Sequence, residues 1–319
     1  MTILVTGGLG YIGSHTVVEL LNNNFEVVII DDLSNTEKFI LKNIEEISGK
    51  KPIFYPFDLK RKELLKQVFD AHKIEGCIHF AAYKAVGESQ VKPIDYYENN
   101  LFSLINLLQE MKERNISNFI FSSSCTVYGQ ADTMPIDENT PLKLPESSYG
   151  KTKQMGEEIL KDFATAHQKK VTLLRYFNPI GAHPSAKLGE LPIGIPNNLV
   201  PYVMQTAAGV REKLSVWGND YPTEDGTAIR DYIYVVDLAK AHVKALQKLI
   251  SENSETLVDI YNLGTGKGSS VLEVVHAFEK ANDVAVPYQI CERRAGDITI
   301  AYANADKAEK ELGWKSETS

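Results

Sequence analysis

A tyrosine and a lysine one helical turn apart, Tyr149 and Lys153, are the side chains of this sequence best suited to proton transfer. Residues at this spacing share one face of a helix, so the ammonium can lie near the phenol. A nearby positive charge favours the phenolate, and we expect Lys153 to lower the pKa of Tyr149 from about 10 toward the working pH. Such a phenol can exchange a proton with a hydroxyl whose carbon exchanges hydride with a nicotinamide. The pair alone also fits an amphipathic surface tyrosine beside a solvated lysine.

A glycine-rich turn near the amino terminus is the second chemical feature. The segment Gly8–Gly13 has GxGxxG spacing, between a short apolar run at 3–6 and a helical pattern at 12–21. Glycines in this context let the backbone approach a pyrophosphate, which the amide dipoles at the start of the helix stabilise. A second apolar run, 26–30, is followed by Asp31, whose carboxylate can accept ribose hydroxyls and repels a 2′-phosphate. The order of these elements predicts binding of NAD in preference to NADP.

The elements that would position these residues alternate between strand and helix to about residue 176, which indicates an α/β fold with a Rossmann-type doubly wound parallel sheet. Further strands are expected at 52–55, 76–80, 118–121 and 171–176, with helices at 93–113 and 149–166. Ligands of such sheets bind beyond the carboxyl ends of the strands, where Ala81, Ser124 and Phe177 are expected to lie.

After residue 178 the pattern changes. The stretch 179–201 is rich in proline and glycine and predicts loops over a ligand. Shorter elements are expected beyond it, with helices at 199–208, 236–250 and 270–281 and strands at 214–217 and 258–262. We therefore expect an NAD-binding domain over 1–178, to which segments at about 230–265 return, and a smaller α/β domain over 179–319 that mainly binds the substrate.

Composition limits the classes of function. The 319 residues carry a formal charge of −8, from 34 Lys+Arg and 42 Asp+Glu, which does not favour nucleic-acid binding. The three cysteines, Cys77, Cys125 and Cys291, and the seven histidines lack metal-ligand spacing, so we expect reduced thiols and no metal site. The sequence has no leader-like start and no apolar run near the ~20 residues that span a bilayer, so a cytoplasmic protein with no membrane partner is expected.

Longer motifs make the sequence similar to the UDP-galactose 4-epimerases (UDP-glucose 4-epimerases) of the extended short-chain dehydrogenase/reductase family. The similarity runs from Thr2 to Trp314 and is carried by the segments 6–15, 80–89, 121–129, 149–153, 175–179, 197–201, 220–226, 230–232 and 293–297. The glycine turn and the Tyr149/Lys153 pair mark only the superfamily, whereas 84–89 and the stretch through 226 are typical of the epimerases. The resemblance implies an isomerase of galactose metabolism that reversibly epimerises UDP-hexoses at C4 through a transient 4-keto sugar, with NAD as cofactor.

The resemblance also implies roles for individual residues. Tyr149 would exchange the proton of the sugar 4-hydroxyl, Lys153 would tune it and hold the nicotinamide ribose, and Ser124 would hydrogen-bond the reacting oxygen. Residues expected to contact NAD are Gly7, Gly10, Tyr11, Ile12, Gly13, Asp31, Asp32, Asn35, Asp58, Leu59, Phe80, Ala81, Ala82, Lys84, Asn99, Ser122, Tyr149, Lys153, Tyr176 and Phe177. Those expected to contact the UDP-sugar are Lys84, Ser124, Tyr149, Asn178, Asn198, Leu199, Leu214, Val216, Trp217, Arg230, Tyr232, Val271, Arg294, Asp297 and Ala301. Taken alone, Arg230 and Arg294 fit pairing with a structural carboxylate better.

A homodimer is a further implication of the resemblance, because relatives pair the helices 93–113 and 149–166 across an intersubunit four-helix bundle. Met155, Ile159 and Phe163 form an apolar stripe on the second of these helices. From the pattern alone, this stripe fits packing on the sheet as well as contact with a partner subunit.

Ala301 stands where some relatives carry a tyrosine that faces the sugar. Its small side chain leaves room for an N-acetyl group, so UDP-GalNAc and UDP-GlcNAc are expected as further substrates, unless neighbouring Tyr302 fills the space. Relatives also usually continue with one more helix after the segment 311–314, whereas this sequence ends at Ser319.

Two other functions compete with the epimerase. A nucleotide-sugar 4,6-dehydratase of the same fold needs an Asp-Glu pair directly after the serine, where Cys125 and Thr126 stand here. A non-catalytic NAD-binding regulator could use the same fold, since fold alone does not define function, but it has little need for Tyr149 and Lys153.

Overall fold

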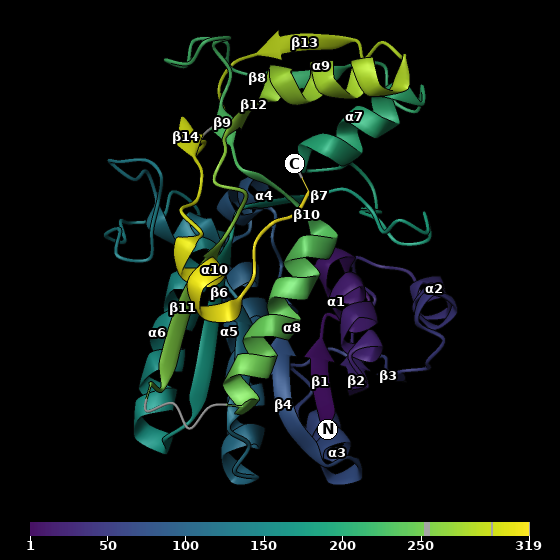
Figure 1. Cartoon of the computed structure of the whole chain (residues 1–319), viewed down its shortest axis with the longest axis vertical. Helices are drawn as coiled ribbons and strands as arrows, with labels where there is room; N and C mark the ends of the chain where they lie inside the picture. The colour runs from purple at the N-terminus through teal and green to yellow at the C-terminus, as the bar shows by residue number, and fades with distance from the viewer. Residues whose placement is uncertain (252–255, 295, 319) are drawn as a thin grey trace.

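A seven-stranded parallel sheet forms the centre of the larger unit in the computed structural model, which describes residues 1–251, 256–294 and 296–318 (Figure 1). Its strands are β1 (Thr2–Thr6), β2 (Glu26–Ile30), β3 (Ile53–Tyr55), β4 (Ile74–His79), β5 (Asn118–Ser122), β6 (Lys170–Tyr176) and β11 (Val258–Leu263). They lie in the order β11-β6-β5-β4-β1-β2-β3, and every neighbouring pair is parallel. The predicted Rossmann-type fold is confirmed. In this order the chain changes direction between β1 and β4, where such sheets bind their ligands.

Helices cover both faces of this sheet. The helices α1 (Tyr11–Asn22), α2 (Phe39–Ser48) and α8 (Val235–Ser251) contribute to the core on one face, and α3 (Lys62–Ala71), α5 (Pro93–Glu113) and α6 (Ser148–His167) to the core on the other. Successive strand residues point to opposite faces, so Ile3 and Val5 enter one core and Leu4 enters the other, all fully buried. Burial of each such side chain stabilises the fold by about 1.5–3 kcal/mol. Burial on both faces explains why the strands are continuous apolar runs.

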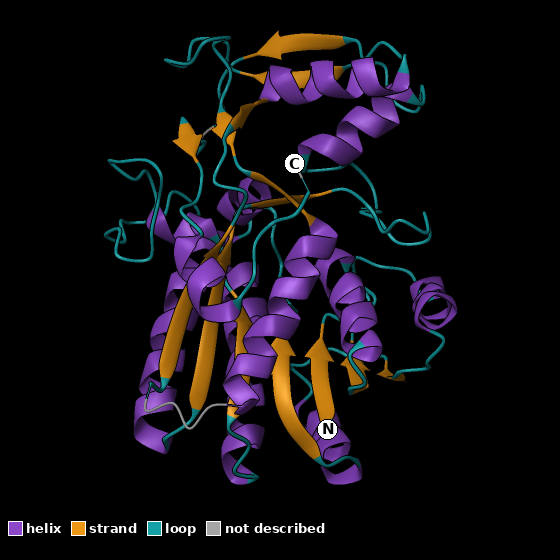
Figure 2. Cartoon of the chain, viewed as in Figure 1, coloured by secondary structure: helices purple, strands orange, loops and turns teal. Residues whose placement is uncertain are grey.

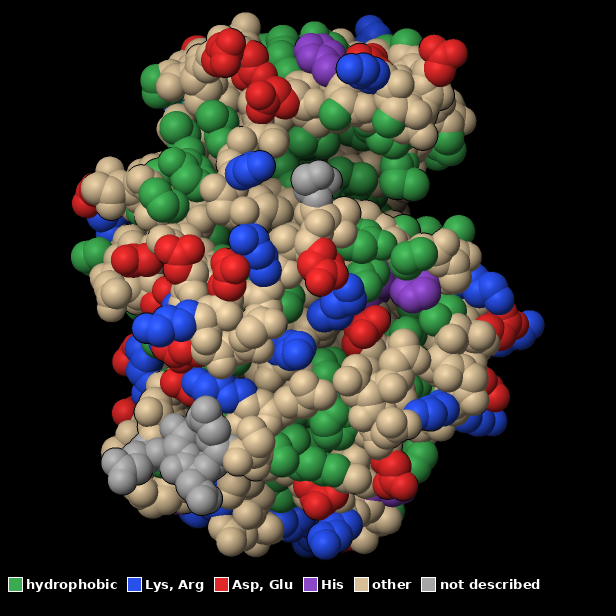
Figure 3. All heavy atoms as spheres, in the orientation of Figure 1, with side chains coloured by type: hydrophobic (Ala, Val, Ile, Leu, Met, Phe, Trp, Pro, Cys, Tyr) green, Lys and Arg blue, Asp and Glu red, His purple; other side chains and the backbone are tan. Residues whose placement is uncertain are grey.

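A smaller unit lies beyond the carboxyl ends of the parallel strands (Figure 2). It contains α7 (Leu199–Ala207), β8 (Leu214–Trp217), α9 (Val271–Asn282) and β13 (Tyr288–Cys291) around a separate apolar core that includes Val203, Val216 and Val275. The remaining elements are short: α4 (Val86–Val91), η1 (Cys125–Tyr128), β7 (Asn178–Ile180), β9 (Ile229–Arg230), β10 (Tyr232–Tyr234), β12 (Ser269–Ser270), β14 (Ile300–Ala301) and α10 (Asp306–Leu312). Figure 3 shows an indentation between the upper and lower parts of the molecule, with hydrophobic side chains beside it.

The main departure from the sequence-based expectation lies in 179–201, which was predicted as loops. Its beginning belongs to strand β7, whose partner is the parallel strand β10. Short strands of this kind depend on a distant partner for their hydrogen bonds, so local proline and glycine content did not reveal β7. In the described part of the chain, none of the helices combines the length and apolarity needed to cross a membrane.

Candidate active site

The turn between β1 and α1 provides a close backbone approach. Gly7 has a φ of +68°, and a Cβ atom there would lie 2.8 Å from the Ala81 amide nitrogen after β4. A Cβ atom on Gly13 would lie only 2.1 Å from the Gly7 carbonyl oxygen. Gly10, the N-cap of α1, has no side chain with which to satisfy the first amides of the helix. The turn therefore fits the diphosphate of a dinucleotide, which would meet these amides and the helix dipole.

Asp31 lies directly after β2, beside this turn. Its carboxylate accepts hydrogen bonds from the amides of Leu9 and Leu33, each at 3.0 Å, and the residue is buried. Burial raises the pKa of Asp31, and the bonds from Leu33 and Leu9 oppose the rise. A carboxylate has more acceptor positions than these amides use, so the orientation fits ribose hydroxyls and disfavours a phosphate.

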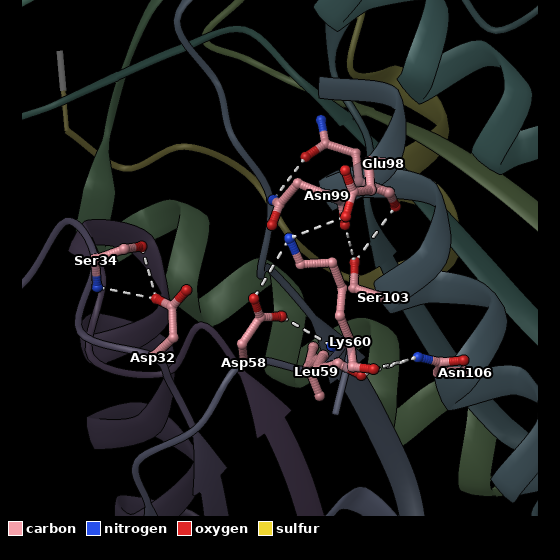
Figure 4. Close-up of polar contacts among 10 residues, drawn as sticks. Asp32, Ser34, Asp58, Leu59, Lys60, Glu98, Asn99, Ser103 and Asn106 are labelled. Carbon is pink, nitrogen blue, oxygen red and sulfur yellow. Dashed lines mark hydrogen bonds and ion pairs between the residues drawn. The ribbon is translucent and has the colours of Figure 1, made fainter. Parts of the chain in front are cut away.

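A second group of predicted cofactor residues gathers past the ends of β2 and β3 (Figure 4). The Asp32 carboxylate accepts hydrogen bonds from the amide and hydroxyl of Ser34, at 2.9 and 2.6 Å. Asp58 forms an ion pair with Lys60 at 3.5 Å, and Lys60 also reaches Glu98 at 3.7 Å, next to Asn99 on α5. The Leu59 carbonyl accepts a hydrogen bond from Asn106 at 3.1 Å. Polar groups after β3 and on α5 are thus held together, as binding of the adenosine end of a dinucleotide would require.

Lys84, after β4, is held by a carboxylate that the sequence reasoning did not select. Its ammonium lies 2.9 Å from Glu190 Oε1. The same oxygen accepts a hydrogen bond at 2.5 Å from the side-chain amide of Asn198, the residue before α7. Tyr11, on the glycine turn, donates a hydrogen bond from its hydroxyl to the Gly181 carbonyl at 2.7 Å. Burial is the main cause of the raised pKa of Tyr11, and the Glu190 charge adds to the rise. One carboxylate therefore connects residues predicted for the cofactor with one predicted for the substrate.

The predicted catalytic residues come together at the carboxyl ends of β4 and β5. Ser147 caps α6 by accepting the Gly150 amide at 3.1 Å, which places Tyr149 in the first turn of the helix. Tyr149, Lys153 and Ser124 are 8%, 4% and 7% exposed. The Lys153 ammonium donates to the Ser122 carbonyl at 2.6 Å and lies 5.8 Å from the centre of the Tyr149 ring.

The electrostatics of this group differ from the prediction that Lys153 lowers the pKa of Tyr149. Burial raises the pKa of the Tyr149 phenol above its usual value, Tyr176 adds to the rise, and a hydrogen bond with Ser124 opposes it. Burial also lowers the pKa of Lys153 to about 7, so its charge is only partly present at neutral pH. Here desolvation of the phenolate outweighs a lysine whose ammonium is directed at Ser122, so the direction is opposite to the one that the spacing predicted.

Most of the remaining residues predicted for NAD lie at the carboxyl ends of β4, β5 and β6. The Ser122 and Tyr176 hydroxyls are 2.5 Å apart, and Phe177 is buried just after β6. The Phe80 amide donates to the Thr6 carbonyl at 3.0 Å, so the chain leaves β4 alongside the glycine turn. Ile12 and Asn35 lie on α1 and in the segment after β2, and Ala82 follows Ala81.

Charged residues predicted for the UDP-sugar form a cluster on the other side of the site. Asp297 accepts hydrogen bonds from Arg294 at 3.0 and 3.3 Å and forms an ion pair with Arg230 at 3.8 Å. Each arginine does therefore pair with a carboxylate, but with one that was itself predicted to bind ligand. Arg294 also lies 5.9 Å from the ring centre of Trp217, which is 41% exposed. Burial raises the pKa of nearby Tyr232 to about 12, and Arg230 and Arg294 oppose the rise.

Some predicted contacts are placed differently from the rest. The side chains of Leu214 and Val216 are buried in the core of the smaller unit, so only their backbone could face a ligand. Leu199 and Val271 begin α7 and α9, and Asn178 begins β7. Ala301 is 1% exposed in β14, where it packs in a small apolar cluster.

Two buried or half-buried carboxylates were missed by the sequence reasoning. Glu157 lies one turn after Lys153 on α6, and its spacing on the same helix face was a usable signal. Glu190 stands alone in an irregular segment, and its spacing carries no comparable signal.

The fold and these residues define the class as a dinucleotide-binding enzyme of the extended short-chain dehydrogenase/reductase type. Residues 4–319 match the family model described as GDP-mannose 4,6 dehydratase. A UDP-glucose 4-epimerase from Bacillus subtilis (strain 168) is 54% identical over 99% of the chain and 92% of the relative. The chain belongs to the UDP-glucose 4-epimerase family, as the sequence motifs predicted.

Solved structures agree with this assignment. A UDP-glucose 4-epimerase from Bifidobacterium longum, in complex with NAD+ and UDP, is 49% identical, with a TM-score of 0.97 over 100% of this chain and 94% of that one. A UDP-glucose-4-epimerase from Stenotrophomonas maltophila, with bound NAD and formylated UDP-arabinopyranose, is 45% identical, with a TM-score of 0.95 over 100% and 94%.

Proposed function

We propose that this chain epimerises UDP-hexoses at C4 with NAD, interconverting UDP-galactose and UDP-glucose. The observation that carries the proposal is the buried group of Tyr149, Lys153 and Ser124 at the carboxyl edge of the sheet. The glycine turn with Asp31 and the cluster around Asp297 are the two further groups of residues that were predicted to hold the dinucleotide and the nucleotide-sugar. A hydride carrier and a nucleotide-sugar would therefore meet at a proton-transferring phenol.

The residues of the chain supply binding, orientation and proton transfer. When bound, NAD supplies reversible hydride exchange with the sugar C4, and the residues around the glycine turn and Asp31 would hold it. Tyr149 would accept the proton of the sugar 4-hydroxyl as C4 is oxidised. It would return the proton to the same oxygen as the 4-keto sugar is reduced on the other face of C4. Ser124 would hydrogen-bond the reacting oxygen, and Lys153 would stabilise charge on the phenol oxygen. Proton and hydride both return to the sugar, so the reaction has no net redox change.

Recognition of the UDP-sugar would rest on the smaller unit. Arg230 and Arg294 can donate to diphosphate oxygens with guanidinium forks, and Asp297, which now pairs with both, can accept ribose hydroxyls. The exposed indole of Trp217 offers a flat surface for a base. This division supports an NAD-binding domain over 1–178, with about 230–265 returning to it through α8 and β11, and a mainly UDP-sugar-binding domain over 179–319.

The dehydratase alternative is not favoured. Elimination of water from the sugar needs a second acid and base beside the serine, and Cys125 and Thr126 provide no carboxylate there. Burial also raises the pKa of the Cys125 thiol to about 12, which makes it a poor base at neutral pH.

Product analysis of one reaction separates these functions. Purified protein is incubated with UDP-galactose, and the sugar signals are followed by proton NMR. Formation of UDP-glucose supports the epimerase, a dehydrated 4-keto sugar would indicate the dehydratase, and an unchanged spectrum in the presence of added NAD would indicate a binding protein without catalysis.

Acceptance of N-acetylated sugars is a finer part of the proposal. Ala301 lies in β14 beside Arg230 of β9, and its methyl group occupies less volume than a tyrosine ring. Because Ala301 is buried against an apolar cluster, the acetyl group would have to enter beside it through a small rearrangement of that cluster.

A homodimer through α5 and α6 is the second finer part. Their outer faces expose Phe102 and Met155, by 55% and 44%, and a groove of about 340 Å³ between them is lined by residues that include Ile105 and Ile159. Ile159 and Phe163 line this groove and also pack against the sheet core, so the predicted apolar stripe contributes to both. A cytoplasmic location completes the proposal and rests on the sequence alone.

A further inference from the structure

Glu157 is a buried carboxylate on the same helix as Tyr149 and Lys153. It lies on α6, one turn beyond Lys153 and two turns beyond Tyr149, and its side chain is fully buried. Its Oε1 atom accepts hydrogen bonds from the Ser123 hydroxyl at 2.6 Å and from Arg175 Nε at 2.9 Å. Its Oε2 atom pairs with Arg175 Nη2 at 2.5 Å. The carboxylate is thus fully engaged by one hydroxyl and one bidentate guanidinium.

The pair continues into a network that crosses the site from α6 to β11. Arg175, on β6, is only 2% exposed and also donates to the Tyr128 hydroxyl at 3.0 Å. Tyr128 in turn donates to Asn262 on β11 at 2.7 Å. A buried network of this kind is satisfied only when its members keep one arrangement, because an unpaired buried charge is costly.

The bond to Ser123 connects this network to two catalytic partners at once. Ser123 follows β5 between Ser122, whose carbonyl accepts the Lys153 ammonium, and Ser124, which hydrogen-bonds Tyr149. Any shift of Ser123 would move both partners relative to α6. Small displacements of reacting groups are sufficient to reduce rates strongly.

Glu157 also acts on Lys153 through its charge. The groups that interact with the Lys153 ammonium are Tyr149 and Glu157 on α6, His79 on β4, and the Phe121 ring and Ser122 carbonyl on β5. Arg175 and Tyr176 on β6 are bonded to Glu157 and to the Ser122 hydroxyl, respectively. Burial lowers the pKa of Lys153 to about 7, and the Glu157 carboxylate raises it. The His79 pKa is lowered to about 3 by burial and by Lys153, so His79 is neutral at working pH.

We propose that Glu157 is a positioning residue for the epimerase reaction, which locks Ser123 against α6 and supports the positive charge of Lys153. The inference rests on the proposed function. It assigns to a buried acid, which was not predicted to contact either ligand, the task of keeping Ser122, Ser124 and Lys153 in the arrangement that proton transfer by Tyr149 requires.

The experiment uses the intact protein loaded with NAD, after wild-type conversion of UDP-galactose has been established. Absence of wild-type epimerisation would defeat the proposed function and is thereby distinguished from failure of this inference. Ser123→Ala removes only the link to β5 and keeps the ion pair, whereas Glu157→Gln keeps the size of the side chain and removes its charge. Thr206→Ala is the control, because Thr206 is buried in α7 and loses a hydroxyl bond of 2.9 Å to the Tyr202 carbonyl, away from the catalytic group.

Ser123→Ala is expected to lower kcat by about ten- to a hundredfold, with NAD content and the KM for UDP-galactose near wild type. Glu157→Gln is expected to shift the pH profile. Lys153 is charged below its pKa, so kcat falls as pH rises through that pKa, and loss of the carboxylate moves the fall to lower pH.

Neither change is expected in Thr206→Ala. Should Glu157→Gln fail to fold, as judged by circular dichroism, Ser123→Ala decides alone. A folded Ser123→Ala protein with wild-type kcat would overturn the inference, and so would a folded Glu157→Gln protein with wild-type kcat and an unshifted profile.

Discussion

Replacement of Tyr149 by phenylalanine tests the proposed chemistry most directly. The substitution deletes the phenol oxygen from a side chain that is 8% exposed and leaves the ring packed in place. It removes the hydrogen bond with Ser124 and the only atom of this side chain that can carry a proton. Lys153 keeps its bond to the Ser122 carbonyl, so the rest of the group is expected to hold its geometry.

The expected losses of rate and of folding stability follow from the two roles of the phenol oxygen, in proton transfer and in the folded protein. Positioned proton transfer contributes about 10²–10⁴ in rate, which corresponds to about 2.7–5.4 kcal/mol of barrier at 1.36 kcal/mol per tenfold. The folded state loses one hydrogen bond, worth about 0.5–1.5 kcal/mol, and no longer buries a hydroxyl group. We therefore expect kcat to fall by at least about a hundredfold while the melting temperature changes by no more than about 3 °C.

Turnover is measured by proton NMR of UDP-galactose conversion, nucleotide content by chromatography of the denatured protein, and unfolding by circular dichroism. Tyr261→Phe is the matched control. Tyr261 is fully buried on β11, and its hydroxyl bonds Lys248 at 2.6 Å and Glu311 at 2.8 Å, outside the site. Tyr261→Phe should lose at least as much hydrogen bonding as Tyr149→Phe and still keep wild-type turnover.

A Tyr149→Phe protein with kcat within a fewfold of wild type would refute the assignment of the phenol as the proton carrier. A fall in kcat accompanied by loss of NAD or a collapse in melting temperature would show instead that the hydroxyl is structural.

Three further predictions concern the cofactor, the substrate and the assembly. The purified protein should carry NAD without supplementation, because the hydride must return to the same sugar. Asp31→Ala should weaken the preference for NAD over NADP, as measured by reconstitution of nucleotide-stripped protein. A stripped wild type that prefers NADP would contradict the role of Asp31. Ala301→Tyr should suppress conversion of UDP-GlcNAc at least about tenfold more than that of UDP-glucose, because bulk at a packed site is rejected sterically; steady-state rates that fall equally for both sugars would count against it. The protein should be dimeric in light scattering at micromolar concentration, and Ile105→Glu should shift it toward monomer by placing a charge in the groove between α5 and α6; a wild-type monomer would remove this interface.

The sequence was a reliable guide where local pattern decides structure. The apolar run of β1, the glycine turn, α1, β2 and Asp31 follow one another within a short segment, so each could be recognised from its neighbours. Tyr149 and Lys153 were placed on one helix face by their spacing alone, and the structure has both in α6. The helices expected at 93–113, 149–166 and 236–250 agree with α5, α6 and α8 to within one residue at each end.

Tertiary structure decided the contacts between distant segments. Strand β7 forms through its pairing with β10, and Glu190 meets Lys84 and Asn198 only because the segment after β7 folds back over the end of β4. The orientation of Leu214 and Val216 into the core of the smaller unit likewise depends on the helices that pack against β8.

Charge states were the property least accessible from sequence. Spacing correctly placed a cation beside Tyr149, but the pKa of that phenol is raised, because burial by several strands and loops removes it from water. The same burial brings the Lys153 pKa to about 7. It also shields the ion pair of Glu157 and Arg175 from water. The sequence alone determined which residues share a helix face or a turn, since those distances are local. Desolvation and long-range pairing depend on everything that packs around a group, and only the folded chain decides them.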